Sequence, residues 1–294
     1  MIDYRVKKGK SMEFIRKNES NTLKVNQYKE MIYLTFPLLE NTGLVRHLFS
    51  TRMGGARRGI YSSMNLSFSR GDNKEDVDEN FRRIAQILDS TPEHIVCSKQ
   101  THTTNVRKVT EEDLGKGVVR ETDYDDVDGL ITNVPGIILA TFYADCVPLY
   151  FVDVKKGAIG LSHSGWRGTV NRMGQATLQA MKRAYGTEPS DVMAAIGPSI
   201  CQDCYEVGEE VADAFRKRFP NEWEYLIRKG KEEGKHQLDL QETNRRILLA
   251  AGVLPENIAV TDICTCCNSE LLFSHRGSNG KRGNLGAFLE LRKS

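Results

Sequence analysis

Three apolar runs decide the fold: Ile137-Ile-Leu-Ala-Thr-Phe142, Leu149-Tyr-Phe-Val-Asp-Val154 and Ala158-Ile-Gly-Leu-Ser162. Each run has the length of a strand and is bounded by polar or turn residues. Continuous apolar sequence, rather than strict alternation, is typical of strands buried on both faces of a sheet. The runs therefore predict central core strands, with a hairpin at Lys155-Lys-Gly157 between the second and the third.

Helical patterns surround these strands. Val77, Phe81, Ile84 and Leu88 recur at helical spacing after Asp72 and Asn73, which are both favourable N-cap residue types. Further helices are predicted from about Thr169 to Gly186, over Val207 to Phe219, and over Leu240 to Ala251. Further strands are predicted over Met31–Phe36, Leu44–Phe49, Val192–Ile196 and Ile258–Thr261, and short apolar segments occur around Leu271–Phe273 and Ala287–Leu291. This mixture favours one domain of the α/β or α+β class over residues 31–294, preceded by a peripheral extension over residues 1–30.

Composition narrows the function classes. The 294 residues carry 41 Lys and Arg against 39 Asp and Glu, a net charge of +2, which gives no electrostatic case for nucleic-acid or membrane-surface binding. The N-terminal sequence lacks the apolar core of a secretory signal, and no run approaches a membrane span, so we expect a cytoplasmic protein. Its seven cysteines should then be reduced. Six histidines without a His-x-His pair disfavour multicopper oxidation on stoichiometry alone. The oligomeric state stays open.

Polar residues gather where predicted strands end. Three segments stand out, Ser98-Lys-Gln-Thr-His102, Tyr143-Ala-Asp-Cys146 and Ser162-His-Ser-Gly-Trp-Arg-Gly168. Together His102, Cys146 and His163 offer two imidazoles and a thiolate, a three-ligand set of the kind used by catalytic zinc. Two other interpretations remain open: the three side chains are satisfied locally, or Cys146 is a nucleophile activated by His163. The predicted helix after Gly168 and the guanidinium of Arg167 would suit an anion.

A set of short motifs occurs in a consistent order over residues 45–291, and together they resemble the laccase-domain or YfiH-like family. The motifs are Ser50-Thr-Arg-Met-Gly-Gly55, Met64-Asn-Leu66, Gln100-Thr-His102, Ala144-Asp-Cys-Val-Pro148, His163-Ser-Gly-Trp-Arg-Gly168, Ile196-Gly-Pro-Ser-Ile200, Cys204-Tyr-Glu-Val207 and Leu272-Phe-Ser-His-Arg276. One departure is His275, where relatives more often have Tyr, so a role for this residue is in doubt.

The resemblance implies a layered α/β fold with sheets covered by helices, and a metal ion, zinc rather than copper, on His102, Cys146 and His163. It also implies a small-molecule substrate: phosphorolysis of adenosine, inosine, guanosine or methylthioadenosine, with adenosine deamination as a side activity. The candidate substrate- and phosphate-binding residues are Arg52, Asn65, Gln100, Asp145, Arg167 and Arg276. Among them the arginines would bind the anion, while Gln100 and Asp145 would orient ligands or substrate.

Other activities stay open at this point. Labels used in the family suggest a Cys146–His163 hydrolase that edits peptidoglycan precursors, or a copper-dependent polyphenol oxidase. A non-catalytic binding module is a third class.

Five further thiols, at Cys201, Cys204, Cys264, Cys266 and Cys267, could form a second thiolate cluster, but buried packing residues are the favoured interpretation. His47, His94 and His236 are expected to face solvent or to cap local structure.

Overall fold

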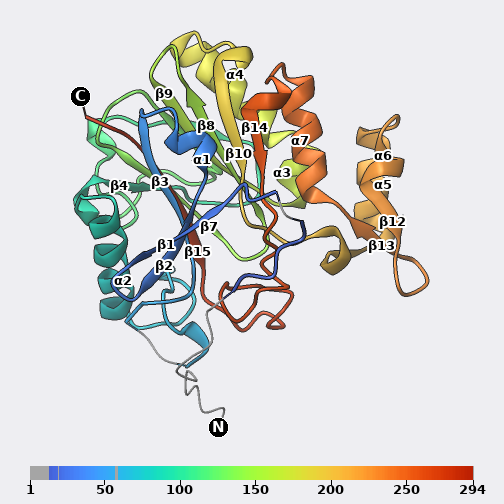
Figure 1. Cartoon of the computed structure of the whole chain (residues 1–294), viewed down its shortest axis with the longest axis horizontal. Helices are drawn as coiled ribbons and strands as arrows, with labels where there is room; N and C mark the ends of the chain where they lie inside the picture. Colours follow the sequence, from blue (N-terminus) through green and yellow to red (C-terminus); the bar gives the residue numbers. More distant parts are fainter. Residues whose placement is uncertain (1–12, 19, 57–58, 294) are drawn as a thin grey trace.

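Two six-stranded sheets pack face to face in the computed structural model, which describes residues 13–18, 20–56 and 59–293 (Figure 1). The first sheet has the order β1 (Lys24–Tyr28), β2 (Met31–Thr35), β3 (Val45–Ser50), β15 (Leu285–Leu291), β7 (Ile138–Tyr143) and β4 (Ile95–Cys97). The second has the order β14 (Ile258–Val260), β10 (Val192–Ile196), β8 (Val147–Asp153), β9 (Ala158–Ser164), β6 (Gly129–Thr132) and β5 (Val106–Lys108). The chain passes from one sheet to the other between β7 and β8.

Helices cover the outer faces of both sheets. The helices are α1 (Pro37–Glu40), α2 (Lys74–Ile87), α3 (Trp166–Val170), α4 (Met173–Tyr185), α5 (Glu209–Arg218), α6 (Trp223–Leu226) and α7 (Leu240–Ala250). In Figure 1, α2 flanks the first sheet and α4 and α7 flank the second. A small sheet, β11 (Glu206–Gly208), β13 (Lys235–Leu238) and β12 (Ile227–Lys229), stands to one side with α5 and α6.

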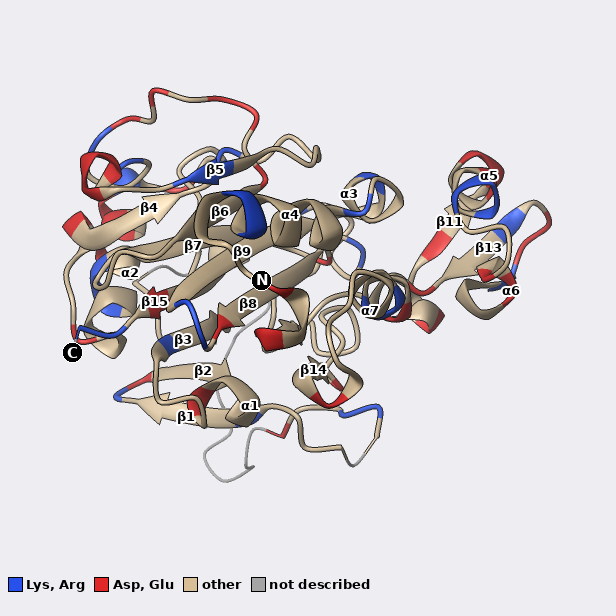
Figure 2. Ribbon diagram, turned by 90° about the horizontal axis from the view of Figure 1, so that it is seen from above, with Lys and Arg blue, Asp and Glu red and all other residues tan. Residues whose placement is uncertain are grey.

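Side-chain alternation within the central strands builds three cores. In β8, Tyr150 and Val152 point into the space between the sheets, whereas Leu149 and Phe151 point toward α4 and α7. In β7, Leu139 belongs to the core between the sheets, and its neighbours pack against α2. Both faces of these strands are therefore buried, which is the physical reason for their continuous apolar sequences. The charged residues lie mainly on the outer helices and loops (Figure 2).

The structure confirms the mixed α/β class and the three central strands. The predicted strands at Met31–Phe36 and Val192–Ile196 and the helix that Asn73 caps are also present. Across the described residues, no helix is both long enough and apolar enough to span a membrane.

Three details differ from expectation. The helix expected from about Thr169 is divided, because Arg172 adopts a left-handed conformation (φ 61°) between α3 and α4. With five residues, α3 is too short for the expected anion site at its N-terminus. Val207 lies in β11, so α5 begins only at Glu209.

The segment before residue 31 is partly integrated. Residues 1–12 lie outside the described residues. β1 pairs antiparallel with β2 at the edge of the first sheet. The Arg16 guanidinium forms an ion pair with buried Asp262 at 2.8 Å. The domain boundary at residue 30 stays a prediction.

His47 lies inside the protein, so the expectation that it faces solvent or caps local structure is wrong. It occupies β3 in the middle of the first sheet and is 5% exposed. Its Nε2 accepts a hydrogen bond of 2.8 Å from the backbone N–H of Phe36, and its ring packs against Tyr150. Burial lowers the pKa of His47 to about 3, so the imidazole is neutral at neutral pH.

The buried neutral imidazole should make folding sensitive to mild acid. Below the ordinary histidine pKa of 6.5, His47 binds a proton in the unfolded chain but stays neutral in the folded chain. The free energy of unfolding therefore falls as the pH is lowered from 6.5 toward 3. Between pH 7 and pH 5 the wild type should lose about 2 kcal/mol more than a His47→Gln variant. Urea unfolding of both proteins at the two pH values measures this difference. An equal loss in the two proteins would contradict the assignment.

Candidate metal centre

His102, Cys146 and His163 come together where the two sheets connect. His102 lies in the loop that follows β4, Cys146 in the turn from β7 to β8, and His163 in β9. Residue 163 pairs with Pro148 in the antiparallel β8–β9 ladder, so strand register brings it beside the turn that carries Cys146. One ligand atom from each residue lies within 4.8 Å of the other two. The three residues that the sequence proposed as a set therefore share one location.

One buried carboxylate positions two of these side chains. Asp128, immediately before β6, is fully buried and accepts a 2.7 Å hydrogen bond from Nδ1 of His163. Its carboxylate also accepts the backbone N–H groups of Thr101, His102 and Thr103 at 2.8, 3.1 and 3.1 Å. Because Nδ1 of His163 is bonded to Asp128, Nε2 is the ring nitrogen that can bind a metal ion. The sequence left the role of Asp128 open because its partners are distant along the chain.

Two residues of the site have unusual backbone conformations. His102 has φ 70° and Asp145, beside Cys146, has φ 95°, values that residues with a side chain rarely adopt. The hydrogen bonds to Asp128 hold the backbone conformation of His102. The conformation of Asp145 is held by two hydrogen bonds of 2.7 Å. Its Oδ1 accepts from the Thr265 hydroxyl, and its Oδ2 accepts from the Arg276 backbone N–H. Strain of this kind persists only where the surroundings over-determine the conformation, which is common at functional sites.

The charges of the three groups support one another. Burial alone would raise the pKa of the Cys146 thiol, but His163 and His102 together lower it to about 6. Burial likewise opposes the charged form of His163, yet Cys146 and Asp128 raise its pKa to about 9. Burial would raise the pKa of Asp128, and the His163 contact and backbone N–H groups lower it. In the metal-free protein the site thus favours a thiolate, the form of cysteine that binds metals.

The residues present fit a zinc ion. Two imidazoles and a thiolate suit zinc, and three protein ligands leave a position open for water or substrate. Space beside the ligands is kept free by Gly165, where an added Cβ would lie 2.9 Å from His102 Cδ2 and 3.1 Å from Cys146 Sγ. A residue with a side chain at this position would displace the ligands.

The three ligands line a cavity of about 420 Å³. Gln100 also lines it, but its amide is bonded to the backbone N–H and C=O of Phe142, at 2.7 and 2.8 Å. Asn65 is fully buried, and its Oδ1 accepts the backbone N–H of Asn284, a residue that lines the cavity. Gln100 and Asn65 thus fix the walls of the cavity, and Asp145 fixes the Cys146 turn.

The three arginines proposed from the sequence are not among the residues that line this cavity. The Arg52 guanidinium donates to the carbonyls of Ser62 and Ser269, and that of Arg276 donates to the carbonyls of Cys204 and Glu206. Arg167 is exposed and lies over the Trp166 ring. Their roles in binding phosphate stay predictions.

Two other arginines line the cavity, Arg70 and Arg282. Sequence reasoning missed both, since each lies in a loop and no short motif marks it. The Nε atom of Arg282 is buried and has no hydrogen-bond partner in the part of the chain described. Burial, and then the charge of Arg70, lower the pKa of Arg282 to about 10. A partly buried cation beside a second cation is a favourable place for an anion.

The fold and this site define a class of protein: a layered α/β domain in which two histidines and a cysteine, a candidate metal-binding set, meet at the junction of two sheets. The family described as multi-copper polyphenol oxidoreductase laccase matches residues 46–292. The chain therefore belongs to the laccase-domain family.

Several members of the family are similar over most of their length. Purine nucleoside phosphorylase YlmD of Geobacillus stearothermophilus is 40% identical over 83% of this chain and 89% of its own. Adenosine deaminase RL5, from an unknown prokaryotic organism, is 37% identical over 82% of this chain and 92% of its own. The crystal structure of Bacillus licheniformis hypothetical protein YfiH superposes with a TM-score of 0.86 at 32% identity, over 92% of this chain and all of that one.

Removal of the Asp128 charge should weaken metal binding. In an Asp128→Asn variant, His163 loses its charged orienting partner, and such substitutions typically lower metal affinity by about 10- to 100-fold. Competition with a chromogenic chelator measures the affinity. Asp126→Asn is the matched control, since this half-buried carboxylate lies on the same loop and bonds to the Thr101 hydroxyl and the Asn105 amide but to no candidate ligand side chain. Equal affinities in the two variants would show that Asp128 does not position the site.

Proposed function

We propose that the protein is a zinc-dependent purine nucleoside phosphorylase. The observation that carries the proposal is the cavity that places a three-donor metal site and two arginines together. An enzyme that transfers a ribosyl group to phosphate must bind an anion and a neutral nucleoside side by side. The names of the YlmD relatives support this reaction.

Arg282 and Arg70 are the groups best placed to bind phosphate. The unpartnered Nε of Arg282 offers a donor that faces no competing protein acceptor among the described residues. A phosphate dianion would relieve the repulsion between the two guanidinium groups and would accept bidentate hydrogen bonds. Positive potential at this point is local, because the net charge of the chain is only +2.

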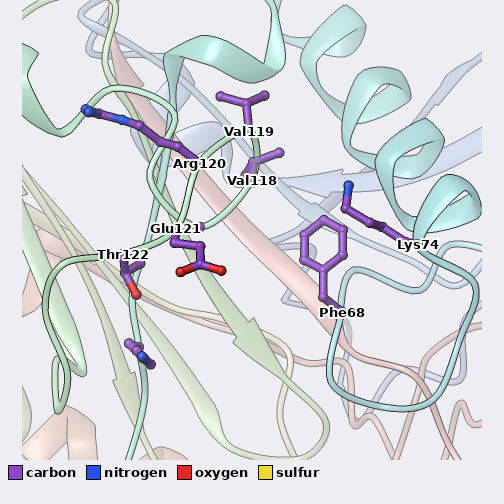
Figure 3. Close-up of a pocket in the computed structure, with 9 residues that line it drawn as sticks. Phe68, Lys74, Val118, Val119, Arg120, Glu121 and Thr122 are labelled. Atoms are coloured by element: carbon purple, nitrogen blue, oxygen red, sulfur yellow. The ribbon is translucent and has the colours of Figure 1, made fainter.

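A second hollow adjoins the cavity and suits the purine base. It measures about 610 Å³ and shares Phe68, Lys99, Gly117 and Thr122 with the inner cavity. Figure 3 shows Phe68 on one side of this hollow and Val118 and Val119 on the other. Phe68 is 38% exposed; its ring stacks on that of Phe81 with the ring centroids 5.5 Å apart, and Lys74 Nζ lies 5.6 Å from its ring centroid. An exposed aromatic face opposite aliphatic side chains would stack a flat base.

Phosphorolysis then proceeds by substitution at C1′ of the ribose. A phosphate oxygen forms a bond to C1′, the bond from C1′ to the base nitrogen breaks, and the purine leaves with that electron pair and takes up a proton. Zinc, when bound, supplies a Lewis acid that polarises an oxygen ligand. The arginines hold the phosphate close to C1′.

Adenosine deamination is a second reaction that we propose for the same site. It replaces the 6-amino group by oxygen from water and releases ammonia. The name of the RL5 relative supports it. Copper-dependent oxidation has less support, because within the described ranges only one group of candidate ligands contains histidine.

A thiol hydrolase remains the competing function, because Cys146 with a lowered pKa lies beside His163. The metal separates the two proposals. A zinc phosphorylase loses activity when a chelator removes the metal. A hydrolase with Cys146 as nucleophile becomes more active, because removal of the metal frees the thiolate.

The decisive assay incubates zinc-loaded protein with adenosine, inosine, guanosine or methylthioadenosine, with and without phosphate. Free base and ribose 1-phosphate (methylthioribose 1-phosphate from methylthioadenosine) should form only when phosphate is present, and inosine and ammonia should appear from adenosine even without it. Cys146→Ala should abolish both activities. Absence of both activities, together with chelator-activated cleavage of a peptidoglycan precursor, would replace the proposal by the hydrolase.

Substitution of Arg282 tests the phosphate site. Arg282→Gln should raise the KM for phosphate by about 10-fold or more, the loss expected for a charged hydrogen bond, and should change the KM for nucleoside much less. Steady-state kinetics with each substrate varied in turn measure this split. Lys281→Gln is the matched control, because Lys281 is the exposed neighbour and does not line the cavity. Equal effects of the two substitutions would remove Arg282 from the phosphate site.

A further inference from the structure

Four cysteines outside the cavity meet at a single point. They form two Cys-x-x-Cys pairs, Cys201/Cys204 and Cys264/Cys267, which are 63 residues apart in the sequence. Their four Sγ atoms all lie within 4.8 Å of one another, and that of Cys204 lies 3.5 Å from that of Cys267. The fifth thiol in these segments, Cys266, is not a member of the group.

This arrangement differs from the packing role expected for these thiols. Cys201 and Cys264 are buried as expected, but Cys204 is only partly buried and Cys267 is exposed. An exposed thiol contributes little to a core, and two independent disulfides would require two pairs rather than four sulfurs in mutual proximity. In a tetrahedral zinc tetrathiolate with bonds of about 2.3 Å, neighbouring sulfurs lie about 3.8 Å apart. The 3.5 Å between Cys204 and Cys267 and the 4.8 Å limit on all four Sγ atoms are compatible with this separation.

The backbone around the four thiols is arranged for thiolate sulfur. Sγ of Cys264 accepts the backbone N–H of Cys201 at 3.3 Å and that of Cys267 at 3.4 Å. Hydrogen bonds from N–H groups stabilise a charged sulfur. A short β-bridge between Ser199 and Cys264 holds the two segments side by side. Both Cys-x-x-Cys pairs are thus presented toward one point by fixed backbone.

We propose that Cys201, Cys204, Cys264 and Cys267 form a second, structural zinc site that is closed to substrate. A tetrathiolate site of two Cys-x-x-Cys pairs has all four positions of the metal filled by protein. It supplies no open position for chemistry. Its contribution is to join two segments that are distant in sequence, and metal binding there adds to folding stability.

The two segments that carry the four cysteines also contact the turn that presents Cys146 to the cavity. The N–H of Ile200 donates to the carbonyl of Asp145 at 2.9 Å, and the Thr265 hydroxyl donates to its carboxylate. These two residues neighbour Cys201 and Cys264. Asp145 in turn precedes Cys146 in the turn from β7 to β8. The Cys204 carbonyl additionally accepts a 3.2 Å hydrogen bond from the Arg276 guanidinium. The second zinc site is therefore expected to fix the turn that presents Cys146.

Zinc stoichiometry tests the proposal without any activity assay. Protein purified with a thiol reductant should contain about two zinc ions per chain, and the His102→Ala variant about one after mild chelator treatment. In the His102→Ala background, Cys267→Ser should lose this remaining zinc, whereas Cys266→Ser should keep it. Cys267 is exposed, so its substitution removes a ligand without leaving a cavity in the core.

Cobalt substitution and thermal unfolding give two further readouts. In the His102→Ala background, cobalt should produce the intense visible and near-ultraviolet bands of a tetrathiolate, which Cys267→Ser should abolish and Cys266→Ser should retain. Cys267→Ser in the otherwise wild-type chain should lower Tm more than Cys266→Ser does.

Two results would overturn the proposal. The first is a His102→Ala protein that holds no zinc and gives no tetrathiolate spectrum. The second is a Cys204–Cys267 disulfide, detected by mass spectrometry of the alkylated, unreduced protein. Neither result bears on the phosphorylase, whose failure would appear as a lack of turnover in protein with a filled His102–Cys146–His163 site.

Discussion

The carboxylate of Asp128 is the contact on which the rest of the site depends. It is fully buried, and it binds the His163 ring and three consecutive backbone N–H groups around His102. The loop after β4 belongs to the first sheet, whereas β6 and β9 belong to the second. One buried anion thus joins the two sheets at the place where the candidate metal ligands meet. Its desolvation is compensated by these donors together, so loss of any of them leaves the buried charge less well satisfied.

The face-to-face packing of the sheets explains why the site lies at their junction. Most side chains in the strand interiors are apolar on both faces. The candidate ligands lie near strand ends and in loops, close to the point where the chain passes from one sheet to the other at Cys146. The two positive φ values at His102 and Asp145 occur at this point. Hydrogen bonds from both layers hold them, which gives a rigid ligand set on a rigid scaffold.

Separate groups of residues perform separate tasks around the cavity. Gln100, Asn65 and Asp145 bond mainly to protein groups and set the shape of its walls. Arg52 and Arg276 bond to backbone carbonyls and fasten loops, whereas Arg70 and Arg282 line the cavity itself. The cysteine tetrad extends this support, because it fastens the segments that hold Asp145. A near-neutral chain can in this way present strong positive potential at one point.

The sequence by itself determined the central strands, most of the helices and a set of three candidate metal ligands, but not β1, β4, β5, β6 or the small sheet of β11, β12 and β13. Apolar periodicity is a local property, and the resemblance rests on short motifs, so both could be read without the fold. It did not determine the break between α3 and α4, because the left-handed Arg172 has no local signal. Nor did it determine the burial of His47, the hydrogen bond between Asp128 and His163, the presence of Arg70 and Arg282 in the cavity or the convergence of two Cys-x-x-Cys pairs. Each of these depends on contacts between segments far apart in the chain, which strand pairing within each sheet and the packing of one sheet on the other bring together.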